Sequence, residues 1–182
     1  MFNRTLTLSL ALWVFGISLV WAKPPALDWN QFRDFDWNFS IDTPFHLVKD
    51  RAASTNDSVF YSTAPQEGEY HGMEVRVGVT FFPDPKKTLT VDETPKMVLD
   101  TLLGEKRVTG LKLFDTPYFY KGTRFLVSNG TAVNKAGKTV KFKVLNAVLL
   151  PYWWRVIISY DASQPRHENI ADRIVTSFEI QP

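Results

Sequence analysis

The chain has 182 residues, of which 45% are apolar and 22% charged, the composition of a folded domain rather than of a disordered tail. Its formal net charge of only +2 excludes the strong basic excess of a dedicated nucleic-acid binder. The absence of cysteine excludes disulfides, thiolate metal sites, cysteine nucleophiles and a lipoprotein-type acyl anchor.

Residues 1–22 have the three-part pattern of a secretory signal peptide. Arg4 lies in a short basic start, residues 6–20 carry no charge, and Val20 and Ala22 occupy the two positions that signal peptidase recognises. The apolar run of about 15 residues is shorter than the ~20 that cross a bilayer comfortably. We therefore predict export to the periplasm, or to another extracytoplasmic compartment, with cleavage after Ala22. Retention of the segment as an uncleaved anchor is the alternative.

Residues 23–38 are expected to form a linker or leader in front of the folded domain. Four large aromatic residues in this segment are expected to dock onto that domain: Trp29, Phe32, Phe35 and Trp37. A single domain is predicted over residues 39–182, a length that buries a sizeable core without disulfides.

The first half of the domain is predicted to form strands and one helix. We expect strands at residues 39–45, 59–62 and 74–82, of which the first is an edge strand broken at Pro44 and the last alternates most clearly. Thr90 and Glu93 have the spacing of a capping box, which predicts an amphipathic helix of about ten residues that ends at Gly104.

The second half is rich in predicted strands. They are expected at residues 112–114, 118–120, 124–131, 139–149 and 154–160, with turns at 115–117 and 135–138. A second amphipathic helix is expected to begin near Pro165, and residues 178–180 to return to the sheet. Together these elements predict an α+β fold, a mainly antiparallel sheet covered by two amphipathic helices.

Three short motifs are spread over the predicted domain: FSIDTP at residues 39–44, GTRF at 122–125 and IVTSFEI at 174–180. In this order, and in an exported domain of this size, they resemble the PsbP-like family. That family includes the extrinsic PsbP protein of photosystem II and periplasmic proteins of the DcrB type. The resemblance covers residues 36–181 and implies a PsbP-like sandwich with a non-enzymatic accessory or binding role. It supplies no catalytic residues, and no thylakoid address supports a photosystem role.

The sequence offers little that resembles an active site. His46, His71 and His167 are far apart, and a metal site assembled from His71, Glu69 and Glu74 is the alternative that folding leaves open. The chain contains no GxSxG nucleophile motif and no glycine-rich phosphate loop. We therefore predict that the protein is not an enzyme, with no catalytic residue, metal ligand or cofactor.

Basic residues gather on two neighbouring predicted strands and their turns: Lys121, Arg124, Lys135, Lys138, Lys141 and Lys143. Alternation places Lys141 and Lys143 on the same side of a strand. This basic hairpin is a candidate surface for an acidic partner or for the anionic lipids of a membrane. The alternative is a solvated sheet face, or lysines that protect an edge strand from aggregation.

Trp153, Trp154 and Arg155 form the second candidate surface. Adjacent strand residues point to opposite faces, so one tryptophan can fill the core while the other contacts a partner. Burial of both tryptophans is the alternative. Taken together, the sequence predicts an exported, non-enzymatic accessory or binding protein that contacts an envelope protein or the envelope surface. The alternative function is a small-molecule or lipid carrier with an aromatic-lined pocket between sheet and helix.

Overall fold

The structure is a computed structural model that describes residues 27–67, 70–84, 86, 88–104 and 108–181. The predicted signal peptide, residues 1–22, lies outside these residues. None of the helices in the described part of the chain is long and apolar enough to span a membrane.

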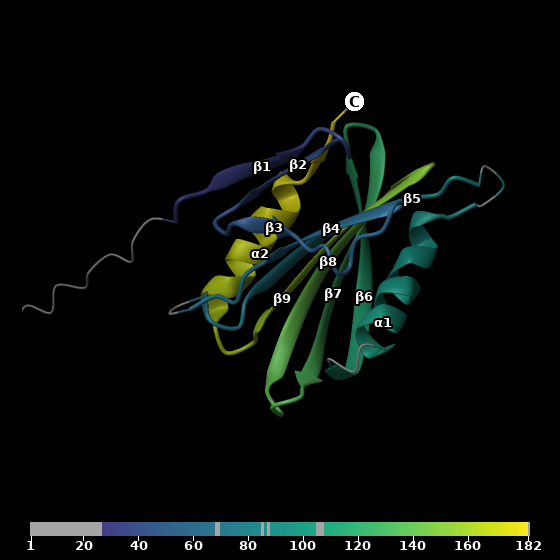
Figure 1. Cartoon of the computed structure of the whole chain (residues 1–182). Coiled ribbons are helices and arrows are strands. Elements are labelled where there is room, and N and C mark those ends of the chain that lie inside the picture. The colour runs from purple at the N-terminus through teal and green to yellow at the C-terminus, as the bar shows by residue number, and fades with distance from the viewer. Residues whose placement is uncertain (1–26, 68–69, 85, 87, 105–107, 182) are drawn as a thin grey trace, which may run out of the picture.

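Two antiparallel sheets organise the described residues (Figure 1). The large sheet has the spatial order β3 (Leu47–Lys49), β4 (Ser58–Thr63), β5 (Glu74–Phe81), β9 (Tyr152–Asp161), β8 (Thr139–Leu149), β7 (Thr123–Asn134), β6 (Val108–Tyr120). The small sheet has the order β1 (Asn30–Asp34), β2 (Phe39–Thr43), β10 (Glu179–Ile180). The helices are the 3₁₀ helix η2 (Val91–Glu93), α1 (Thr94–Gly104) and α2 (Pro165–Ser177).

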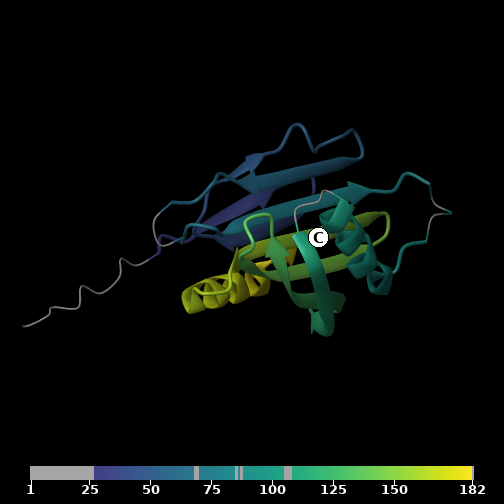
Figure 2. The same ribbon diagram turned by 90° about the horizontal axis from the view of Figure 1, so that it is seen from below.

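The two faces of the large sheet are covered by different elements. The face that we call the α2 face carries Val77 and Val156, and it packs against α2, which also contacts β2 of the small sheet. The opposite face, the α1 face, carries Phe142 and Val144 and packs against α1 and η2. Figures 1 and 2 show α1 and α2 on opposite sides of the large sheet. The chain is therefore an α+β protein with a large antiparallel sheet and two helices, in which the small sheet shares the cover of the α2 face.

Both helices begin where the sequence predicts. The Thr90 amide donates a hydrogen bond to the Glu93 carboxylate at 2.8 Å, which completes the capping box ahead of α1. Pro165 occupies the first turn of α2, where its missing N–H removes no helical hydrogen bond. Ile170 and Ile174 lie on the buried side of α2 and anchor it to the core.

The expected leader contains a strand. Residues 30–34 form β1 and pair with β2, which consequently lies in the middle of the small sheet and not at an edge. Trp29, Phe32 and Trp37 pack against the core of the α2 face as expected, whereas Phe35 is 77% exposed. The sequence pattern did not indicate β1, because three of its five residues are exposed and apolar residues do not alternate along it.

The turn expected at residues 115–117 is wrong, because β6 runs through it without a break. Pro117 lies in register with Leu126 of β7. β6 is the outermost strand of the large sheet, so only one side of its backbone needs to pair. A proline whose nitrogen faces away from the neighbouring strand is tolerated at such an edge.

Candidate functional site

A cavity of about 720 Å³ lies on the α1 face of the large sheet. It is bounded by residues of β5, β8 and β9, by α1, and by the connection from β4 to β5. The cavity exists because α1 packs mainly on β6, at the far edge of the sheet, and leaves part of this face uncovered.

The floor of the cavity is apolar. Val140 and Phe142 reach it from β8 and Ile157 from β9, because alternate residues of a strand share a face. Further apolar lining residues are Leu102 of α1, Val108 of β6, and Ala64, Pro65 and Met73 of the β4–β5 connection. These side chains give an apolar ligand a surface from which water can be displaced.

Polar and charged side chains also line the cavity, and Arg76 is the most buried of the charged ones. Its guanidinium lies 3.3 Å from the Asp50 carboxylate and 5.2 Å above the Phe60 ring. Half-buried Ser159 of β9 and exposed Glu74 of β5 lie in register with each other across two neighbouring strands. The cavity therefore joins an apolar floor to hydrogen-bonding and charged groups.

Arg155 lies beside this cavity, in a row of residues that crosses the sheet. Its guanidinium stacks between the rings of Phe60, at 4.6 Å, and Trp153, at 4.1 Å. Gly78 stands between Phe60 and Arg155 in the register, and a Cβ there would come within 2.6 Å of the Phe60 ring. Burial, and to a smaller extent the charge of Arg76, lowers the pKa of Arg155 to about 10. The polar end of the cavity thus adjoins a second, desolvated cation.

Both tryptophans of the second candidate surface are buried, on opposite faces of β9. On the α1 face, the Trp153 indole N–H donates to Asn146 Oδ1 at 3.0 Å. On the α2 face, the Trp154 indole N–H donates to the Trp37 carbonyl at 3.0 Å. Neither tryptophan ring lines the α1-face cavity. Among the described tryptophans, tyrosines and phenylalanines, only Phe142 lines it.

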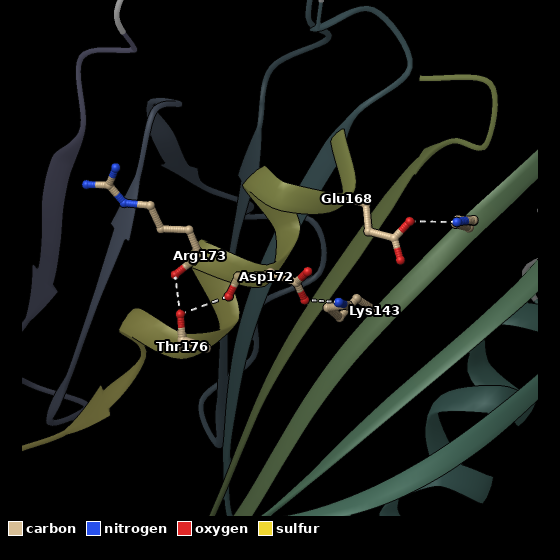
Figure 3. A network of polar contacts seen from close by, with 6 residues as sticks. Lys143, Glu168, Asp172, Arg173 and Thr176 are labelled. Atoms are coloured by element: carbon tan, nitrogen blue, oxygen red, sulfur yellow. Dashed lines mark hydrogen bonds and ion pairs between the residues drawn. The ribbon is translucent and has the colours of Figure 1, made fainter. Parts of the chain in front are cut away.

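Four cations of the basic hairpin contact carboxylates of the same chain. Lys141 binds Glu168 at 2.7 Å, and the buried Lys143 binds Asp172; both carboxylates belong to α2 (Figure 3). Lys121 binds Glu179 at 3.1 Å. Arg124 binds Asp92 through two hydrogen bonds of 2.8 and 2.7 Å. These lysines and this arginine tie α2, β10 and η2 to the large sheet.

Lys135 and Lys138 lie in the turn between β7 and β8, where both are exposed. Lys121 and Arg124 lie at the other end of β7, a strand of 12 residues. At roughly 3.3 Å per residue, the two pairs are more than 30 Å apart along the strand. The structure therefore does not gather the six basic residues on one patch.

The Lys141–Glu168 pair makes stability depend on pH. The hydrogen bond from Lys141 holds the pKa of the Glu168 carboxyl below its ordinary value of 4.5. A lowered carboxyl pKa stabilises the folded protein fully above the ordinary value, and this contribution is lost as pH falls through the folded pKa. At neutral pH we expect Glu168→Gln to be less stable to urea by about 0.2–1 kcal/mol, since the pair is half-exposed. The difference should shrink to nothing in acid; a difference that is constant with pH would contradict this origin.

The described residues contain no cluster of three histidine, aspartate or glutamate side chains placed to hold a metal ion. His71 lines the cavity, whereas His167 is buried in α2. Glu69, which the alternative metal site required, lies outside the described residues. His46 is exposed beside β3.

Comparison with protein-family models and with curated protein sequences gives no match. Among solved structures, the chain is similar to the cyanobacterial PsbP (CyanoP) of Synechocystis sp. PCC 6803, with a TM-score of 0.65 and 11% identity over 86% of this chain and 95% of that one. It is also similar to the Ran-binding protein Mog1p of Saccharomyces cerevisiae, with a TM-score of 0.52 and 13% identity over 85% and 96%. A protein of unknown function from Pseudomonas aeruginosa, PA94, gives 0.50 and 12% over 85% and 98%. The predicted PsbP-like fold is thereby confirmed, and likeness at this level of identity shows the fold alone.

Proposed function

We propose that this chain is an exported, non-enzymatic binding protein of the cell envelope, and that it binds a small amphipathic molecule in the α1-face cavity. The observation that carries the proposal is the cavity itself. Its volume of about 720 Å³ lies within the roughly 300–1,000 Å³ of ligand pockets in proteins. Its lining joins an apolar floor to polar and charged side chains, so both parts of an amphipathic molecule can be contacted there.

The apolar body of the ligand lies on Phe142, Ile157 and Leu102. Burial of its surface there provides most of the affinity, at about 25 cal/mol for each Å² of apolar area removed from water. The polar group of the ligand points toward Arg76 and Ser159, which fix its orientation. The salt bridge with Asp50 already fixes the Arg76 side chain, so ligand binding costs little conformational entropy at this residue.

Export and the lack of catalysis are supported by different observations. The signal-like residues 1–22 support an extracytoplasmic location, in the periplasm of a bacterium. The sequence contains no GxSxG nucleophile motif and no glycine-rich phosphate loop, which supports a non-enzymatic role. Of the similar structures, Mog1p is itself described as a Ran-binding protein.

Replacement of Thr101 with tryptophan is expected to weaken ligand binding strongly. Thr101 is an exposed residue of α1 that lines the cavity, so an indole there occupies the space that the ligand needs. The probes are anilinonaphthalene sulfonate and its uncharged analogue N-phenylnaphthylamine, whose fluorescence rises in apolar surroundings. We expect one binding site per chain in the wild type, and affinity at least about tenfold weaker in Thr101→Trp.

Thr176→Trp is the matched control. Thr176 is exposed on α2, and its hydroxyl donates to the carbonyl four residues earlier at 2.9 Å, as that of Thr101 does at 2.8 Å. This variant adds the same indole on the other side of the sheet and should bind both probes as the wild type does. Equal binding by all three proteins, or binding of many probe molecules per chain, would contradict a ligand site in the cavity.

Contact with an envelope protein or an anionic membrane surface is a second candidate function. It is supported by Lys135 and Lys138, which are exposed at the tip of the β7–β8 hairpin and form no ion pair with another described residue. The candidate surface otherwise consists of Lys121, Arg124, Lys141, Lys143, Trp153, Trp154 and Arg155, whose charges and rings are engaged within the chain. If the protein has this function, it should co-sediment with vesicles that contain anionic lipid and should not co-sediment with neutral vesicles.

A further inference from the structure

A second, smaller hollow of about 270 Å³ lies on the α2 side of the sheet, away from the α1-face cavity. Its lining consists of Asp36, Trp37, Phe81 and Tyr152. The Trp37 ring meets the Tyr152 ring edge-on at 6.3 Å, and the Phe81 ring lies 5.4 Å from the same tyrosine. Three aromatic rings and one carboxylate therefore converge on one place at the surface, which we call the aromatic hollow.

The walls of the aromatic hollow are fixed by hydrogen bonds inside the protein. Asp34 Oδ1 accepts the backbone N–H groups of Asp36, at 3.0 Å, and Trp37, at 3.2 Å. Its other oxygen accepts the hydroxyl of Tyr61. The Trp37 carbonyl accepts the indole N–H of Trp154. Because the turn is held at both ends, a ligand meets a site that needs little rearrangement, which favours binding.

The aromatic hollow is suited to a cation. The Asp36 carboxylate is exposed and forms no hydrogen bond or ion pair with another described side chain. The Phe81 amide donates to the backbone carbonyl of Asp57 at 2.7 Å, which holds this end of β5 in place. The faces of aromatic rings attract cations through their quadrupoles, and a carboxylate next to them adds a full negative charge.

Exposed apolar residues near the hollow favour a protein as its occupant. Leu149 lies in register with Tyr152 and is 44% exposed, and its neighbour Leu150 is 52% exposed. Phe35 precedes Asp36 and is the most exposed of the three. A small ammonium ion would leave this apolar surface in water, whereas a protein that inserts one side chain would cover it. We propose that the aromatic hollow receives a lysine or arginine side chain of a partner protein, independently of the ligand in the α1-face cavity.

Chemical-shift titrations of the ¹⁵N-labelled protein test this proposal, with the indole N–H signals of Trp37 and Trp154 as reporters. The probes are acetyl-lysine methylamide, its uncharged analogue acetyl-norleucine methylamide, tetramethylammonium, and a capped Leu-Lys-Leu peptide. We expect saturable shifts with the two lysine probes, tighter binding of the peptide because its leucines cover the rim, and no saturable shifts with norleucine.

Asp36→Asn should weaken lysine binding roughly tenfold or more, because the neutral amide removes the negative charge that pairs with the ammonium group. Asp28→Asn is the matched control, since exposed Asp28 lies just before β1 while Asp36 follows it. Equal shifts with lysine and norleucine, equal binding by the two variants, or tetramethylammonium binding as tightly as the peptide would overturn the proposal. Asp36→Asn should bind the naphthalene probes normally, so failure here and failure of the cavity are distinguishable.

Discussion

Replacing Trp154 with alanine is expected to lower the free energy of unfolding by about 3–5 kcal/mol. The indole is only 4% exposed and packs 5.4 Å from the Tyr152 ring, in the core between the large sheet and the N-terminal strands. Alanine would leave a cavity and release the Trp37 carbonyl from its hydrogen bond. Such a loss is a large share of the roughly 5–15 kcal/mol by which domains are stable.

Trp154→Phe separates packing from hydrogen bonding at this position. Phenylalanine keeps most of the buried apolar area but has no donor for the Trp37 carbonyl, so we expect a smaller loss of about 1–2 kcal/mol. Both losses are measured by urea denaturation followed by circular dichroism. A loss below about 1 kcal/mol for Trp154→Ala would contradict the core position of this side chain, given the usual cost of large-to-small core changes.

Gly130→Ala is expected to destabilise the β6–β7 pair by about 2–3 kcal/mol, the upper part of the range for overpacking. A Cβ at Gly130 would lie 2.3 Å from the carbonyl oxygen of Lys112 and 2.9 Å from the Leu113 side chain. Because the closest atom belongs to the backbone, β6 has to move away from β7. Val108 at the start of β6 lines the α1-face cavity, so the variant should also bind the naphthalene probes more weakly.

Ser128→Ala is the control for Gly130→Ala, in the same strand and on the same face. Ser128 is fully buried, and its hydroxyl forms no hydrogen bond with another described residue. Its removal should leave stability unchanged or raise it by up to about 1 kcal/mol. Equal stability of the two variants in urea denaturation would contradict the close approach of β6 to Gly130.

Strands with a long alternating pattern were predictable from the sequence. β5 alternates apolar and polar residues over its whole length, and β8 does so in its first half, up to Val144. β1 lacks this pattern, and its pairing with β2 depends on contacts that only the folded chain provides. Pro117 was misleading for the opposite reason, since its local preference for a turn is overridden at the sheet edge. The structure of β1 and of the segment around Pro117 is therefore determined by their positions in the sheets and not by the local preferences of their residues.

The candidate surfaces were less predictable than the fold. The sequence places Lys141 and Lys143 on one side of β8, but it does not show that α2 presents Glu168 and Asp172 to them (Figure 3). Their charges are consequently used inside the molecule. The position of the α1-face cavity could not be predicted from the sequence either, because the cavity depends on how far α1 lies from β5. The sequence signal for this cavity was Arg76, because it is a charged residue among the apolar residues of its strand.

The position of a bound probe tests the central proposal most directly. Intermolecular nuclear Overhauser effects can be measured between the ring protons of N-phenylnaphthylamine and the methyl groups of the labelled protein. A ligand in the α1-face cavity should give contacts to Leu102, Val140 and Ile157, which line it. Contacts only to Val156, Ile158 or Ile174, which belong to the core of the α2 face, or saturable binding with no contact to the cavity methyls, would contradict the proposal.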